Sequence, residues 1–83
     1  MSEPGKRDLQ EVMQFDPEEG IVNLEEHLDR LKAQSKALGQ PFDRHAARNE
    51  LQAATFGKRR SGTARLVLSP SGAIAIELKS CGG

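Results

Sequence analysis

Few residues in this sequence could do chemistry, and their spacing does not favour it. The two histidines, His27 and His45, are far apart along the chain, and the single cysteine, Cys81, is close to the C-terminus. Zinc ligands normally recur at short, regular spacings, which are absent here. No serine lies in a nucleophile elbow, and no glycine motif for a phosphate or dinucleotide is present. We therefore expect a protein that is not an enzyme, with no catalytic residues, no bound metal and no cofactor.

Length and composition support this expectation. The chain has 83 residues, of which 36% are hydrophobic and 29% charged. That length allows one domain, which is too small to enclose a substrate pocket of about 300 Å³ or more. No apolar run approaches the ~20 residues of a membrane span, and the polar N-terminus does not resemble a secretory signal. We expect a cytoplasmic protein with no membrane contact.

Charge is distributed unevenly between the two halves of the chain. Residues 1–40 carry five basic and nine acidic side chains, whereas residues 41–83 carry seven basic and three acidic ones. The predicted basic patch consists of Arg44, Arg48, Lys58, Arg59, Arg60 and Arg65. Because affinity for nucleic acid depends largely on neutralising phosphates, such a patch could bind DNA or RNA. It could equally be a solvated loop, or be neutralised by the acidic half.

A helix is predicted over residues 23–38. Asn23 and Glu26 have the spacing of a capping box, and Gly39 provides the C-terminal stop. The apolar positions follow a heptad spacing, with Ser35 filling one gap. This stripe could pack on the chain's own hairpin or form a dimer seam. The candidate protein-binding or dimer surface consists of Leu24, Leu28, Leu31 and Leu38 with the acidic residues Glu25, Glu26 and Asp29.

A second helix is predicted from Pro41 or Asp43 to about Phe56, with Gly57 as its stop. Its apolar face is thin and consists of Phe42, Ala47, Leu51, Ala54 and Phe56. The link between the helices is very short, so they form an αα-hairpin or corner.

Residues 63–80 predict a β-hairpin around Ser69-Pro70-Ser71-Gly72, which matches a type I turn followed by a glycine bulge. That turn pairs Leu68 with Ile74, Leu66 with Ile76 and Ala64 with Leu78, all on one face. On the other face it places Arg65 opposite Glu77. Two strands alone are marginal in water, so their apolar face must be covered by the helices or by a second chain.

The predicted fold class is α+β, with one small domain over residues 21–80. We expect residues 1–20 to form a flexible acidic and polar tail, although Leu9, Val12 and Met13 also have the spacing of a short helix. Residues 81–83 should form a flexible C-terminus.

The function predicted from these features is that of a small non-enzymatic binding protein. It would act as a regulator, adaptor or inhibitor of another protein, as a homodimer. The alternative is a DNA- or RNA-binding regulator that uses the basic patch. Two helices followed by a hairpin resemble part of a winged helix-turn-helix, in which the second helix would read DNA and the hairpin would be the wing.

Overall fold

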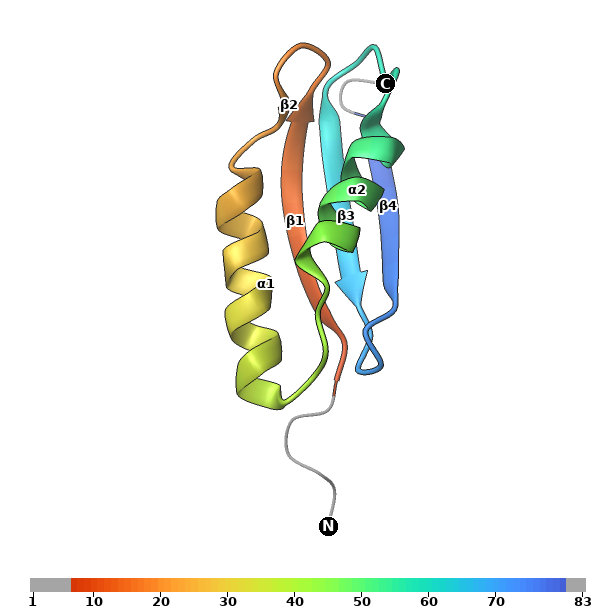
Figure 1. Cartoon of the computed structure of the whole chain (residues 1–83). Coiled ribbons are helices and arrows are strands. Elements are labelled where there is room, and N and C mark those ends of the chain that lie inside the picture. Colours follow the sequence, from red (N-terminus) through yellow and green to blue (C-terminus); the bar gives the residue numbers. More distant parts are fainter. Residues whose placement is uncertain (1–6, 81–83) are drawn as a thin grey trace.

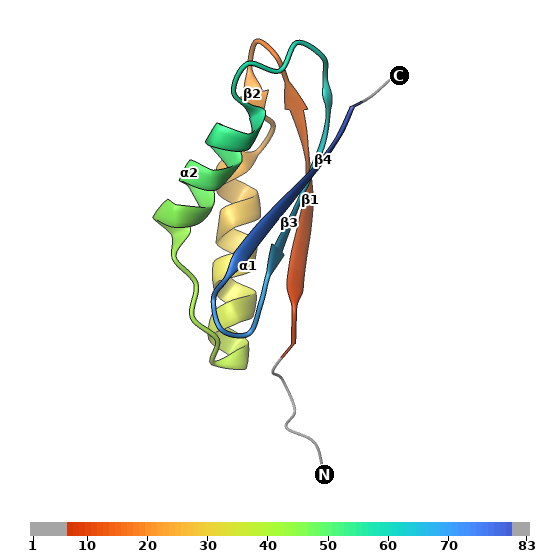
Figure 2. The ribbon, with the colours of Figure 1, turned by 90° about the vertical axis from the view of Figure 1, so that its right-hand side faces the viewer.

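Figure 1 shows the computed structural model, which describes residues 7–80. Along that part of the chain the elements are β1 (Leu9–Asp16), β2 (Gly20–Ile21), α1 (Leu24–Leu38), α2 (Arg44–Thr55), β3 (Gly62–Leu68) and β4 (Ile74–Ser80). The strands form one antiparallel sheet in the order β2-β1-β3-β4. Both helices lie on the same face of that sheet (Figure 2). The predicted α+β class is therefore confirmed.

The N-terminal segment is a strand, so the prediction of a flexible tail is wrong for residues 9–16 and 20–21. Leu9, Met13 and Phe15 face the helices and are almost completely buried, whereas Val12 points to the other face and is 57% exposed. The burial therefore follows the two-residue period of a strand, not the helical spacing of Leu9, Val12 and Met13. Residues 1–6 and 81–83, for which flexible termini were predicted, lie outside the described residues.

Pairing between β1 and β3 connects distant parts of the chain. The ladder runs from Leu9 opposite Leu68 to Phe15 opposite Gly62, so β1 and β4 flank β3 on its two sides. The side chain of Gln40, which is 5% exposed, accepts a hydrogen bond from the Arg7 N–H and donates one to the Arg7 carbonyl. The link between the helices therefore holds the chain where it enters β1.

The predicted hairpin and its register are confirmed. Leu68 pairs with Ile74, Leu66 with Ile76 and Ala64 with Leu78. The Ser69 N–H donates to the Ala73 carbonyl across the turn, and Gly72 has a φ of 97°, which favours glycine. The hairpin is nevertheless not a projecting wing, because β1 adds to its β3 side. The resemblance to a winged helix-turn-helix is therefore wrong.

Both predicted helices form close to their predicted bounds. Gly39, with a φ of 69°, ends α1 as expected, and the Asp43 side chain caps α2 by accepting a hydrogen bond from the Ala46 N–H at 3.0 Å. The predicted capping box is absent, because Asn23 adopts a left-handed conformation and its side chain makes no cap hydrogen bond. At this end of α1 the His27 N–H donates a hydrogen bond to the Asn23 carbonyl at 3.1 Å.

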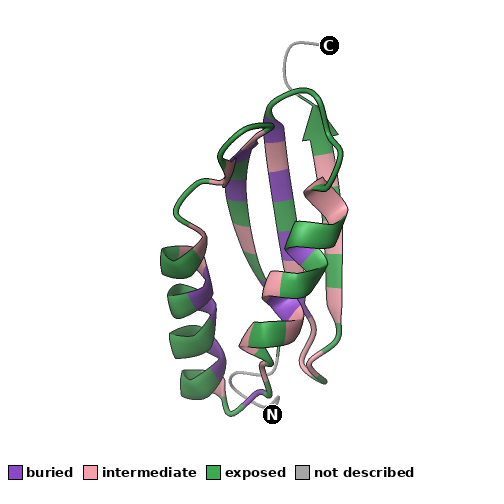
Figure 3. Ribbon diagram, turned by 45° about the horizontal axis from the view of Figure 1, so that its top comes forward, coloured by how far each residue is buried: buried purple, intermediate pink, exposed green. Residues whose placement is uncertain are grey.

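The core lies between the sheet and the two helices (Figure 3). Leu28 and Leu31 of α1 are fully buried in it, and Leu24 and Leu38 pack partly buried against it. The leucine stripe therefore packs on the chain's own sheet, and Leu28 and Leu31 cannot form a dimer seam on the surface. The prediction that Phe56 belongs to the apolar face of α2 is wrong, because this residue is 87% exposed.

Substitution of Met13 by alanine tests the strand assignment of the N-terminal segment. Met13 is fully buried, so Met13→Ala should lower the free energy of unfolding, measured in urea, by about 2–5 kcal/mol. The neighbouring Val12→Ala is the control and should cost less than about 1 kcal/mol, because Val12 faces solvent. Equal, small effects of the two substitutions would contradict the buried strand.

Candidate functional site

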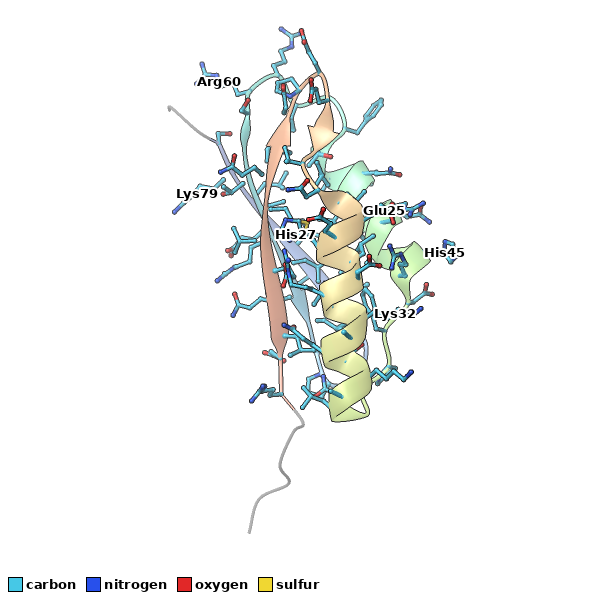
Figure 4. All side chains as sticks on the ribbon, turned by 90° about the vertical axis from the view of Figure 1, so that its left-hand side faces the viewer. Glu25, His27, Lys32, His45, Arg60 and Lys79 are labelled. Carbon is cyan, nitrogen blue, oxygen red and sulfur yellow. The ribbon has the colours of Figure 1, made fainter. Side chains whose placement is uncertain are left out.

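A carboxylate, an imidazole and a guanidinium meet where α1 crosses β1. Glu11 of β1 lies on the helix-facing side of the sheet, in line with Leu66 and Ile76. Its Oε1 atom is 2.6 Å from Nδ1 of His27 and 3.3 Å from Nε of Arg30. The side chains of Glu11 and His27 are only 11% and 13% exposed, while Arg30 extends to the surface. Figure 4 shows His27 between α1 and β1.

The proton arrangement in this Glu11–His27–Arg30 cluster follows from donor chemistry. Nη2 of Arg30 also lies 3.1 Å from Nδ1 of His27, but a guanidinium can only donate. One imidazole nitrogen cannot donate to Glu11 and accept from Arg30 at the same time. We assign the proton to Nδ1, donating to Glu11, because that contact is shorter and assisted by the carboxylate charge. The carboxylate then holds both the imidazole and the guanidinium of α1.

This cluster was not predicted from the sequence. A usable signal was present, since Glu11 interrupts the apolar alternation of Leu9, Met13 and Phe15. A carboxylate at a core position of a strand requires a partner, because an unpaired buried charge is costly. The pairing of Glu11 with residues of α1 is set by the tertiary structure alone.

Within residues 7–80, no helix lies on the other face of the sheet (Figure 2). Three rows of side chains cross this helix-free face: Gln10, Val67 and Ala75; Val12, Arg65 and Glu77; and Gln14, Thr63 and Lys79. Arg65 and Glu77 form an ion pair across the hairpin. The structure describes no ion pair for Lys79 within residues 7–80, and its side chain is exposed.

Two surface hollows adjoin on the helix-free face. One, of about 420 Å³, is lined by residues that include Gln14, Ser61, Thr63, Lys79 and Ser80. The other, of about 430 Å³, lies over Val12, Arg65 and Glu77 and shares Thr63 and Lys79 with the first. Because they share these two side chains, the hollows form one groove, called here the sheet groove.

Gly62 sets the close approach of strands at one end of the sheet groove. A Cβ atom at this position would lie 2.2 Å from the backbone oxygen of Lys79 and 3.0 Å from the ring of Phe15. Glycine is therefore required there for steric reasons, and its proximity to the groove reflects strand packing.

The predicted basic patch does not exist as one surface. Arg44 and Arg48 lie on α2 and form ion pairs with acidic residues of α1. Arg65 lies on the helix-free face, and Lys58, Arg59 and Arg60 lie in the loop between α2 and β3. A surface that follows a phosphate backbone needs these cations side by side, and the fold separates them.

The predicted acidic surface of α1 is largely neutralised within the chain. Oε1 of Glu25 accepts a hydrogen bond from Arg44 at 2.5 Å, and Arg48 pairs with its other carboxylate oxygen. Asp29 pairs with Arg44. The hydrogen bond from Arg44, with the nearby charge of Arg48, lowers the pKa of Glu25 below its usual range. Hydrogen bonds to Glu25 and Asp29 raise the pKa of Arg44.

The remaining candidates do not assemble into a further site. Glu26 and His45 are exposed, and His45 points away from the body on α2 (Figure 4). Cys81 lies outside the described residues. In residues 7–80 no three histidine, cysteine or carboxylate side chains are placed to hold a metal ion. No helix of the described part is long and apolar enough to cross a membrane.

No protein-family model matches the sequence, and no curated protein matches it either. The fold is similar to the crystal structure of a "putative amino-acid aminotransferase" from Mesorhizobium loti, with a TM-score of 0.81 and 26% sequence identity. The match covers 88% of this chain and 35% of that chain, so this chain spans about a third of the Mesorhizobium loti protein.

This similarity contradicts the function predicted from the sequence. A non-enzymatic binding protein, or a nucleic-acid-binding regulator, was expected because no catalytic motif was visible. The similarity instead relates the fold to part of a protein named as an enzyme. No catalytic motif was recognised in the sequence, so this similarity was not predicted.

A double-mutant cycle tests the contact between Glu11 and His27. Glu11→Ala should lower the free energy of unfolding by about 1–3 kcal/mol, because the imidazole loses its partner in a mostly buried place. The double variant Glu11→Ala/His27→Ala should be more stable than the sum of the two single effects predicts, by about 0.5 kcal/mol or more in urea unfolding. Strict additivity would contradict a direct contact.

Replacement of Glu25 by glutamine should have a pH-dependent effect on the melting temperature. Because the folded-state pKa lies below 4.5, the ionised Glu25 stabilises the fold above about pH 4.5, and this contribution disappears as the pH falls through the folded-state pKa. The melting temperatures of wild type and Glu25→Gln should therefore differ at pH 7 and converge toward pH 3. The matched control Glu26→Gln alters an exposed neighbour for which the described part of the chain shows no ion pair. A gap for Glu25→Gln that does not change with pH would contradict the ion pairs.

Proposed function

We propose that this chain forms one part of an enzyme that transfers amino groups between amino acids and 2-oxo acids. The observation that carries the proposal is the similarity to the Mesorhizobium loti structure over 88% of this chain. Fold similarity alone does not define an activity, so the proposal also needs a site of suitable chemistry. The sheet groove provides that site.

The sheet groove has groups that suit a carboxylate. Amino acids and 2-oxo acids share a carboxylate beside the reacting carbon, so an enzyme for both must hold that anion. Lys79 provides an exposed cation in both hollows, and Thr63 beside it provides a hydroxyl, while the carboxylate of Asp16 also lines the first hollow. Arg65 lies in the next row, although its charge is shared with Glu77. A charge-assisted hydrogen bond from Lys79 would fix the carboxylate end of the substrate.

The described residues do not fit the cofactor that such chemistry implies. Amino-group transfer in proteins uses pyridoxal phosphate, bound to a lysine as a Schiff base. A lysine that reacts in this way is desolvated in a pocket or placed beside another cation. The lysines of residues 7–80, namely Lys32, Lys36, Lys58 and Lys79, are all exposed. We therefore derive no step through that group, and the proposed role is to hold substrate, with this chain not an enzyme by itself.

A chimera tests the proposal. Residues 7–80 replace the matched segment of the Mesorhizobium loti protein, and transfer of an amino group to 2-oxoglutarate or pyruvate is measured with a panel of amino acids. The chimera should transfer amino groups with the donor and acceptor that the parent protein uses, whereas this chain alone should not. A folded chimera without activity, or a parent protein without activity, would remove the basis of the proposal.

Lys79 is tested in the same chimera. Lys79→Ala should raise the KM for the amino acid about tenfold, which corresponds to about 1.4 kcal/mol of lost binding. The matched control Lys32→Ala removes an exposed lysine from α1 and should leave the KM unchanged. Binding is also measured on this chain itself by NMR titration with pyruvate, in which the amide signals of Thr63 and Lys79 should shift in wild type. Equal KM values for the two variants, or no shift of these amides, would show that the sheet groove does not hold the carboxylate.

A further inference from the structure

No described element covers the helix-free face of the sheet (Figure 2). Antiparallel sheets often expose one face to water, so a bare face alone does not indicate a partner. Two features of this face go beyond a solvated surface. The first is its mixture of polar and apolar residues, and the second is the sheet groove.

The central row of the helix-free face can be covered at low electrostatic cost. Arg65 and Glu77 neutralise one another, so a partner would not leave either charge unpaired. Val12 is 57% exposed in the same row, and Ala75 is exposed in the row beside it. Val22, at the rim of the sheet groove, is 45% exposed. The face therefore offers apolar area beside the Arg65–Glu77 pair, while Asp16 and Lys79, which line the same hollow, form no ion pair within residues 7–80.

The sheet groove is incomplete as a binding site. Small-molecule sites bury about 70–90% of the surface of their ligand. The walls of the groove are side chains of β1, β3 and β4 with residues next to them, and no described element lies above it. A ligand held by Lys79 would therefore stay in contact with water unless a second body closed the groove.

The length of the Mesorhizobium loti chain suggests what that body is. The match covers 35% of that chain, so about two thirds of it have no counterpart here. On the opposite face of the sheet, α1 and α2 already occupy the surface. The helix-free face is the broad sheet surface that remains for a second folded unit.

We infer that the helix-free face is the docking surface for a second folded unit of the kind formed by the unmatched two thirds of the Mesorhizobium loti chain. Docking closes the sheet groove into a cleft between two bodies, with Lys79 and Thr63 on one wall. The identity of the partner rests on the proposed function. The location of the surface rests on the bare face, the Arg65–Glu77 pair at its centre and the open groove.

Cysteine labelling tests the docking surface. Single cysteines are placed on the helix-free face by Val12→Cys and Ala75→Cys, and on the helical side by the matched controls Lys32→Cys and Glu50→Cys, each with Cys81→Ser. All four positions are exposed in this chain, so a maleimide should label them at similar rates. In the chimera with the Mesorhizobium loti protein, the labelling rates of Val12→Cys and Ala75→Cys should fall at least about tenfold. The controls should keep their rates.

Unchanged labelling of Val12→Cys and Ala75→Cys in the folded chimera would overturn the inference. Concentration-dependent protection of these cysteines in the free chain would also overturn it, because a second copy would then be the occupant. If the chimera does not fold, cysteines are placed in the Mesorhizobium loti protein at the positions that superpose on Val12 and Glu50. The same difference in labelling rate is expected there, and its absence would overturn the inference.

Activity and labelling separate the two proposals. A chimera that is protected at Val12→Cys but transfers no amino groups would overturn the proposed function and support the docking surface. An active chimera that stays fully labelled at Val12→Cys would support the proposed function and overturn the docking surface.

Discussion

The register between β1 and β3 is the constraint on which the rest of the structure depends. β3 is hydrogen-bonded along both edges, and its alternate residues Ala64, Leu66 and Leu68 are fully buried under the helices. Successive side chains of a strand point to opposite faces, so a shift of β1 by one residue would invert its two faces. Met13 would then reach solvent, and the valine and glutamine of the helix-free face would enter the core. The core and the sheet groove are therefore set together by one ladder.

Glu11 is the exception to the apolar helix-facing row of β1, because burial of a carboxylate has a high desolvation cost. A carboxylate in a core row loses hydration, and it is tolerated because His27 and Arg30 compensate for the loss. The cluster joins the start of the sheet to the first turns of α1, whereas the ion pairs of Arg44 and Arg48 join α1 to α2 at the surface. The mostly buried contact adds to the packing of Leu28 and Leu31 in holding α1 on the sheet, while the exposed pairs contribute less because water screens them.

The two faces of the sheet have different roles in this interpretation. The helical face contains the apolar side chains that stabilise so small a chain. The helix-free face is free to carry polar groups, and it holds the sheet groove with Lys79 and Thr63. The similarity to part of the Mesorhizobium loti protein gives this arrangement a chemical context, because one face can fold the unit while the other contributes to a site.

Local elements were predictable from the sequence wherever short-range signals agreed. The hairpin register followed from its turn residues, its alternation and the opposed charges of Arg65 and Glu77, and the helix ends followed from Gly39 and Asp43. β1 was missed because a short segment with few apolar residues fits a helical spacing about as well as an alternating one. The pairing with β3, about fifty residues further along the chain, decides that this segment is a strand and not a helix. The sequence by itself therefore determined the helices, the hairpin and the α+β class. The tertiary structure decided the pairing of β1, the partners of Glu11 and the basic residues, and the position of the sheet groove, because each depends on contacts between residues far apart in the chain.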